Sequence, residues 1–335
     1  MTGARGVAFA VAALLSMIAT ATADSVEQWR AEWPKTDFSQ RAVNLDEIIP
    51  AGVPKGEIPP IDAPRFVLAN AVENLVPTEP VISLVMDGEA RAYPLQTLIW
   101  HQVVNDVVGG VPVAVTYDPL CNAAIVFDRR IRGRALVFGV TGKLRKSNLV
   151  MYDRETESWW QQFTGEAIAG ALTGARLEMI PARLESVARF KERAPGGRVL
   201  VPDNPDFRSY GTTPYVGYDS AAAPFLFIGE LPRKVPPMNR VVAVGDRAWA
   251  LDLLRQEGQI ETGDLVLSWS AGQNSALDTP RIADGRDVGN VIVQRRDEER
   301  RLKDIPYRVV FAFAFRAFEP DGVLHTIAGP VRLDE

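Results

Sequence analysis

Three side chains with reactive or metal-binding chemistry, His101, Asp118 and Cys121, lie close together in the first half of the sequence. A thiolate is a nucleophile and a ligand for soft metals, and an imidazole ligates metals or acts as a base. The Asp118 carboxylate opposes ionisation of a neighbouring thiol unless a bound cation offsets its charge. We therefore predict either a copper or zinc site formed by these residues or a reactive thiol at Cys121 with His101 as its base.

The same residues allow a simpler interpretation, in which Cys121 is a small buried hydrophobe and His101 a hydrogen-bonded core residue. The chain holds one Cys and two His, whereas a blue-copper centre takes two His with one Cys. His325 would have to fold back to complete such a centre. The sequence leaves both interpretations open, names no reaction, and does not decide whether the protein is an enzyme.

A second group of polar and aromatic residues occupies positions 145–160. Ligand pockets combine aromatic walls with a few polar groups, so this group predicts a binding site for a small molecule. A solvated turn beside core tryptophans explains the same pattern. The candidate ligand-binding residues are Arg145, Asn148, Tyr152, Asp153, Arg154 and Trp159.

The elements expected around these residues are mainly short strands. Runs of β-branched and alternating residues bounded by turn signals predict strands at 81–86, 90–93, 111–117, 123–128 and 135–140. Apolar residues at helical spacing from Leu95 to Val103 predict a short helix that carries His101. Residues 187–193 predict another short helix. Pro119 then places Asp118 and Cys121 in a tight loop between two strands.

The sequence contains an internal similarity at a constant offset of 152 positions. Residues 113–134 align without gaps with residues 265–286, so that Tyr117 meets Trp269 and Asn122 meets Asn274. Self-similarity of this kind indicates a duplicated unit. We therefore predict a β-rich α+β fold made of two related β-dominated repeats with short helices. Cys121 aligns with Gln273, which leaves the reactive side chain in the first repeat only.

Three long segments resemble one known family. They read RAYPLQTLIWHQVVND, GGVPVAVTYDPLCNAAIVFDRR and FGVTGKLRKSNLVMYDRETESWWQQFTGEAI, and they are similar to the DUF3179 family of exported bacterial and archaeal proteins of unknown function. In that family the loop after the strand usually reads Cys-Pro-Leu-Cys. Here Asp118 takes the first position, which removes the dithiol chemistry that the resemblance would imply. The resemblance implies no established activity.

The first residues have the pattern of a signal peptide. Arg5 precedes an apolar run from Val7 to Ala19, and small residues at Ala21 and Ala23 match a signal peptidase site. Neither this run nor any later one reaches the roughly 18 apolar residues of a membrane-spanning helix. We expect cleavage near Ala23, a periplasmic or extracellular location, and no transmembrane anchor.

The balance of acidic and basic residues indicates which classes of partner the protein can bind. Removing residues 1–23 deletes Arg5 and no acid, so 36 of the 37 basic residues and all 42 acidic residues remain, a net charge of −6. Nucleic acid is not expected as a partner, because phosphate binding needs a basic surface. A small molecule or a metal ion is the expected partner.

We expect a signal peptide at 1–23, an extended Pro-rich lead-in at 24–65, a first DUF3179-like repeat with the candidate site at 66–200, and a second, degenerate repeat at 201–335. Two functional hypotheses follow. The first is a copper, zinc or thiol site at Cys121 and His101. The second is a non-catalytic ligand-binding or scaffold protein of the cell envelope.

Overall fold

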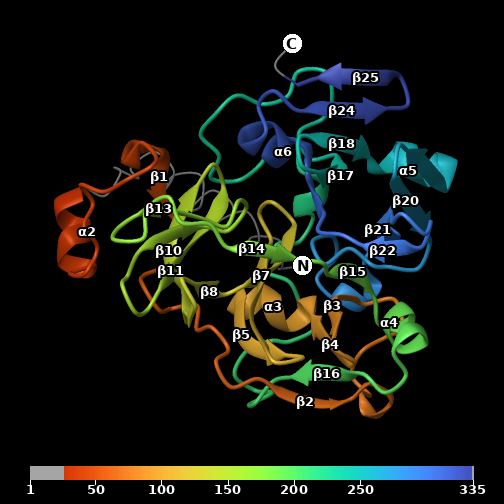
Figure 1. Cartoon of the computed structure of the whole chain (residues 1–335), viewed down its shortest axis with the longest axis horizontal. Helices are drawn as coiled ribbons and strands as arrows, with labels where there is room; N and C mark the ends of the chain where they lie inside the picture. Colours follow the sequence, from red (N-terminus) through yellow and green to blue (C-terminus); the bar gives the residue numbers. More distant parts are fainter. Residues whose placement is uncertain (1–25, 334–335) are drawn as a thin grey trace, which may run out of the picture.

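The computed structural model describes residues 26–333, and the expected signal peptide lies outside the described residues. Within this range the chain forms mostly short strands, gathered into five sheets of four or five strands that surround a common centre in a propeller-like arrangement (Figure 1). The prediction of a β-rich fold with short helices is confirmed. The α-helices in the described range are α2 (Val26–Glu32), α3 (Leu95–His101), α4 (Val187–Arg193), α5 (Leu251–Glu257) and α6 (Ala312–Phe318).

The predicted hairpin and helix of the first half are confirmed. β3 (Pro80–Met86) and β4 (Glu89–Pro94) pair across the turn residues Asp87 and Gly88, which both have positive φ. Two-residue hairpin loops need this conformation because it matches the twist of the strands. α3 follows directly and buries Leu95, Leu98 and Ile99, so the apolar spacing of the sequence marks its core face.

The strands after α3 form a four-stranded antiparallel sheet. β5 (Val103–Val108), β6 (Val111–Asp118) and β7 (Ala123–Asp128) pair in sequence order, and β14 (Glu178–Ile180) adds to β7. Asp118 is the last residue of β6, and the short loop between β6 and β7 carries Cys121, as the position of Pro119 predicts. The small two-stranded sheet of β8 (Arg130–Ile131) and β9 (Arg134–Ala135) follows β7.

Another five-stranded sheet takes four strands from the segment between β7 and β14 and one strand from the lead-in. It consists of β1 (Ile48–Pro50), β10 (Phe138–Arg145), β11 (Asn148–Asp153), β12 (Trp159–Gln161) and β13 (Glu166–Ala169). The lead-in expected to be extended contributes β1 and also the helix α2. Its Trp29 and Trp33 are buried against Trp159, because large aromatic surfaces gain most from removal from water.

Two further five-stranded sheets share the relative order of their first four strands, whereas the fifth strand comes first along the chain in one sheet and last in the other. One runs β15 (Arg183–Ser186), β3, β4, β16 (Arg198–Val201), β2 (Arg65–Leu68), and the other β23 (Arg308–Phe311), β17 (Arg240–Val244), β18 (Arg247–Ala250), β24 (Val323–Thr326), β25 (Gly329–Arg332). In both, the third and fourth strands are parallel and the other neighbours are antiparallel. A helix follows the first strand in each, α4 after β15 and α6 after β23.

The last sheet contains β19 (Gln259–Thr262), β20 (Leu265–Ser270), β21 (Asn290–Arg296) and β22 (Leu302–Asp304). The gapless alignment of residues 113–134 with residues 265–286, at an offset of 152 positions, does not hold across the whole of this sheet. Under that offset β7 would match residues 275–280, but these residues lie in the long loop between β20 and β21. Loop length is less constrained than strand pairing, because loops tolerate insertions on the protein surface.

A central segment, residues 202–239, connects β16 to β17 and contains the short 3-10 helix Tyr218–Ser220. Tyr218 is buried, and its hydroxyl donates to the carbonyl of Leu120 at 2.9 Å. The segment therefore lies against the loop that carries Cys121. Among the described helices, none combines the length and apolarity needed to cross a membrane.

Candidate functional site

Asp118 anchors the loop between β6 and β7 from inside the molecule. One carboxylate oxygen accepts the Leu120 N–H at 3.0 Å, and the other accepts the Leu149 N–H at 3.1 Å and the Asn148 side-chain amide at 2.6 Å. Asp118 is 1% exposed. Three N–H donors satisfy a buried carboxyl group that would otherwise be costly. The carboxyl thus ties the Cys121 loop to the start of β11.

Cys121 lies in the same enclosed environment and is 0% exposed. Its thiol donates to the carbonyl of Ser147 at 3.5 Å. Burial, reinforced by the Asp118 charge, raises the pKa of the Cys121 thiol well above its ordinary value. Burial also raises the pKa of Asp118 to about 6, against the lowering effect of its hydrogen bonds. The thiolate is the nucleophilic and metal-binding form, so this arrangement keeps Cys121 in its unreactive form.

His101 has partners of its own. Its Nδ1 lies 2.7 Å from the carbonyl of Pro59 and its Nε2 lies 2.7 Å from the hydroxyl of Tyr210. Burial lowers the pKa of His101, and a neutral ring fits these contacts with Nδ1 as donor and Nε2 as acceptor. Both ring nitrogens are therefore engaged without a metal ligand role.

The structure brings Asp118 and Cys121 together but gives His101 these other contacts. Within residues 26–333, no cluster of three or more His, Cys, Asp or Glu side chains is placed to hold a metal ion. The donor set expected for copper or zinc is thus not assembled in this conformation. His325, the other imidazole, stacks on Trp249 with the ring centroids 5.3 Å apart.

The polar and aromatic group at 145–160 attaches other segments to β10, β11 and β12. Arg145 pairs with Glu47, and Arg154 pairs with Asp62. The remaining members are held as follows: Asn148 by Asp118, Tyr152 against the Trp33 ring, Asp153 by Thr156 and the Trp160 indole, and Trp159 under Trp29 and Phe38. These contacts match a turn beside core tryptophans more closely than an open ligand cleft.

The tip of the hairpin between β10 and β11 reaches into the molecule. Lys146 and Ser147 both have positive φ, which a two-residue hairpin loop requires but which non-glycine residues adopt at a cost. Ser147 is 0% exposed, and its hydroxyl donates to the carbonyl of Phe225 at 2.5 Å. Lys146 donates to the carbonyl of Ala317 at 2.7 Å. The tip therefore joins the Cys121 loop, the central segment and α6.

An open cavity of about 210 Å³ lies beside this tip. It has a mixed lining of cationic, acidic and apolar groups: Lys146, Phe227, Ile228, Gly229, Glu230, Arg316, Ala317 and Pro320. Burial, and then the nearby charges of Arg145 and Arg316, lower the pKa of Lys146. Two cationic side chains beside an apolar wall suit a small anionic ligand with an apolar part.

Sequence reasoning missed this cavity. Its lining comes from the hairpin tip, from the central segment and from α6 with the turn that follows it. Side chains so far apart in the sequence share no spacing that a motif could record. The apolar stretch around Phe227 is the one part of the lining that stands out in the sequence. It indicates a ligand-binding surface only once Lys146 and Arg316 are known to lie beside it.

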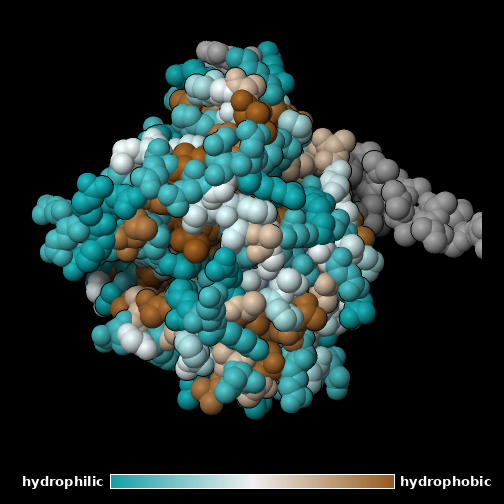
Figure 2. Space-filling model, turned by 90° about the vertical axis from the view of Figure 1, so that its right-hand side faces the viewer, coloured by the Kyte–Doolittle hydropathy of each residue, from teal (hydrophilic) through white to brown (hydrophobic). Residues whose placement is uncertain are grey.

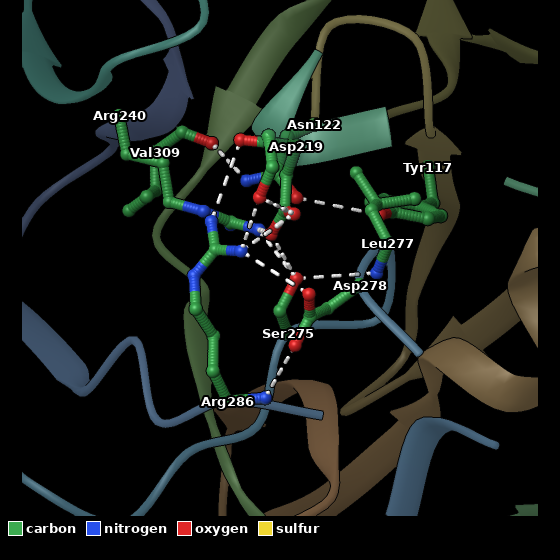
Figure 3. A network of polar contacts seen from close by, with 10 residues as sticks. Tyr117, Asn122, Asp219, Arg240, Ser275, Leu277, Asp278, Arg286 and Val309 are labelled. Carbon is green, nitrogen blue, oxygen red and sulfur yellow. Dashed lines mark hydrogen bonds and ion pairs between the residues drawn. The ribbon is translucent and has the colours of Figure 1, made fainter. Parts of the chain in front are cut away.

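A network of polar contacts surrounds Asp219 of the central segment (Figure 3). The Asp219 carboxylate accepts from Arg240 at 3.0 Å, from Arg286 at 2.9 Å and from the Ser275 hydroxyl. Burial alone would raise the pKa of Asp219, but the Arg240 charge and the hydrogen bonds hold it below its ordinary value. Nearby, the Asn122 side-chain amide donates to the carbonyl of Val309 at 2.9 Å. The network thus links the central segment to β17 and to the loop before β21.

Comparison with known protein families gives a match over most of the chain. The family profile described as a protein of unknown function, DUF3179, matches residues 55–322. No curated protein and no solved structure matches the chain.

Proposed function

The chain belongs to the DUF3179 family, and from that premise we propose that it is a non-catalytic ligand-binding protein whose site is the cavity beside Lys146. The observation that carries this proposal is the cavity itself, which is about 210 Å³ in volume and has two cations next to an apolar wall. Small-molecule sites combine an apolar lining with a few placed polar groups in this way.

The state of Cys121 supports a binding role over thiol chemistry. A catalytic Cys needs access to its substrate and a lowered pKa, whereas Cys121 is fully buried and its pKa is raised by burial. The hydrogen bonds of both His101 ring nitrogens, to Pro59 and to Tyr210, also favour the binding role over a role for His101 as the base.

A soft-metal site at Cys121 is the second candidate, and the burial of the Asp118 carboxyl and the Cys121 thiol three positions apart in one enclosed loop region favours it. The test is elemental analysis of the exported protein and of Cys121→Ser. About one equivalent of copper or zinc in the wild type, absent from the variant, would support the metal site. Equal metal content in the two proteins would exclude Cys121 as a ligand.

We also propose that the cell exports the chain and removes residues 1–23, because the n-region, apolar run and small residues before Asp24 fit signal peptidase. The mature protein would then act in the periplasm or outside the cell. N-terminal sequencing of the protein recovered from those fractions should begin at or near Asp24. A chain that keeps Met1 and stays in the cytoplasm would contradict export.

We propose further that residues 66–200 and 201–335 are two related repeats. The shared order of the first four strands in their five-stranded sheets supports this, and so do reciprocal contacts, in which β7 packs against β23 and β21 packs against β15. The sheet of β1 and β10–β13 would then be an insertion into the first repeat. A superposition in which the shared strands do not coincide would contradict the duplication.

Thermal-shift screening tests the binding role. A library of small neutral, cationic and anionic compounds would be screened against wild type, Lys146→Ala and Lys303→Ala. Lys303 is an exposed lysine on β22 and serves as the matched control. We expect some compounds to raise the Tm of wild type and Lys303→Ala but not of Lys146→Ala, because a ligand that binds only the folded state stabilises it. Compounds that raise the Tm of Lys146→Ala as much as that of the wild type, or the absence of any compound that raises the Tm, would overturn the proposal.

A further inference from the structure

We propose that the cavity beside Lys146 takes an organic monocarboxylate, and that the carboxylate of Glu230 occupies that ligand's place until it arrives. This inference rests on the proposed binding role and adds the chemical class of the ligand. It concerns the edge of the Arg316 guanidinium that carries Nε and Nη2.

Of the two nitrogens on this side of the Arg316 guanidinium, Nη2 has a hydrogen-bond partner and Nε has none among the described residues. Its Nη2 donates to one oxygen of Glu230 at 3.2 Å, and its Nη1 donates to the carbonyl of Pro320 at 3.4 Å. Its Nε is buried and has no hydrogen-bond partner among the described residues. A planar carboxylate can accept from both nitrogens of such an edge at once, at about 2.7–2.9 Å. Glu230 therefore fills one position of a two-position carboxylate site.

The two partners differ in how firmly the fold holds them. The Arg316 side chain is 12% exposed, whereas the Glu230 side chain is 79% exposed. An exposed acid in an ion pair gains little from it, because water competes for both charges. Glu230 is therefore free to leave, while Arg316 stays in the wall of the cavity.

The rest of the lining selects an anion with an apolar part. Lys146 adds a second positive charge, so the cavity without Glu230 carries two cations. Phe227 packs on Phe313 with the ring centroids 5.1 Å apart, and Ile228 stands at the rim, 61% exposed. A ligand with a short hydrocarbon chain would cover this exposed apolar surface while its carboxylate meets Arg316. Inorganic phosphate offers the charge without the apolar contact.

The experiment is isothermal titration calorimetry of the full chain, which measures the Kd for hexanoate, hexanamide and inorganic phosphate. Wild type should bind hexanoate more tightly than either of the other two. Glu230→Gln should bind hexanoate about threefold more tightly, because the competing charge is gone. Arg316→Lys should bind hexanoate about tenfold more weakly, because an ammonium group cannot donate the two parallel hydrogen bonds that a guanidinium donates to a carboxylate. Glu299→Gln removes a comparably exposed acid on another part of the surface and should change nothing.

The outcomes separate this inference from the proposed function. If hexanamide or phosphate binds as well as hexanoate, or if Glu230→Gln leaves hexanoate binding unchanged, the carboxylate assignment is overturned. The binding role would survive that result as long as Lys146→Ala still abolishes binding. Glu230 is an exposed surface residue, so its variant should keep the wild-type Tm even if Arg316→Lys proves unstable.

Discussion

Asp118 and Cys121 carry reactive groups, but the hydrogen bonds of both side chains hold parts of the fold together. Asp118 accepts three hydrogen bonds, and the Cys121 thiol donates one to the Ser147 carbonyl. Both side chains are buried, and burial governs their titration. The ionisable groups that line the cavity are Lys146, Glu230 and Arg316.

The stability of the protein should depend on pH through Asp118. The pKa of Asp118 is about 6 in the folded protein and 3.8 ordinarily. Because the pKa is higher in the folded protein, the contribution of Asp118 to the free energy of unfolding is fully present below about pH 4. It is lost as the pH rises through about 6. The difference in free energy of unfolding between wild type and Asp118→Asn should therefore shrink between pH 4 and 7 by about 1–3 kcal/mol. Urea denaturation at several pH values measures it, and parallel pH profiles would refute the raised pKa.

Cys121 should resist alkylation by iodoacetamide at pH 8 in the native protein and react completely in urea, because it is 0% exposed and its pKa is raised. Mass spectrometry of the alkylated protein gives the extent of labelling. Rapid labelling of the native protein would mean that the loop opens and would favour the thiol hypothesis.

At the scale of elements, the lead-in is packed closely onto β10. Gly142 lies at a β-bulge in β10 with φ of +74°, and a Cβ placed there would lie 2.1 Å from the carbonyl oxygen of Val53. Only glycine permits this approach. The close contact explains how a segment with few regular elements is held against the sheet that contains β10.

Comparing two glycines measures this contact. Gly133 has φ of +76° and nothing within 4 Å of its would-be Cβ. Gly133→Ala should thus cost only the conformational penalty, about 1 kcal/mol. Gly142→Ala should cost about 2 kcal/mol more, because the Val53 backbone must move away. Urea denaturation gives both values, and equal costs would show that the lead-in contact does not stabilise the fold.

At the scale of the molecule, the sheets are joined by buried polar contacts as well as by apolar packing. The main core cluster includes residues from both halves of the chain, and Asp219 links the central segment to β17 and to the loop before β21. The face in Figure 2 is largely hydrophilic with scattered apolar side chains. Singly exposed apolar residues are normal on protein surfaces.

Asp219→Asn should lower the free energy of unfolding by about 3–5 kcal/mol at neutral pH, because it leaves the buried Arg240 without its charge partner. Asp264→Asn breaks an exposed pair with Arg295 and should cost at most about 1 kcal/mol. Denaturant titration of both variants makes the comparison. Similar losses would mean that the central network contributes no more than a surface ion pair.

The sequence by itself determined the family, the β-rich character, the early hairpin, the helix that carries His101 and the tight loop at Pro119. These features depend on local patterns, such as apolar spacing, Asp-Gly turns and the backbone of proline, which act over a few residues. The resemblance to DUF3179 is likewise carried by continuous segments, and the family profile confirmed it over residues 55–322.

Only the tertiary structure decided which side chains meet. It engaged His101 with Pro59 and Tyr210, buried Cys121 beside Asp118, and used the group at 145–160 to hold neighbouring segments. It also brought Lys146, Phe227 and Arg316 to one cavity. Contacts between residues far apart in the chain are set by how whole sheets pack, and no local pattern encodes that packing.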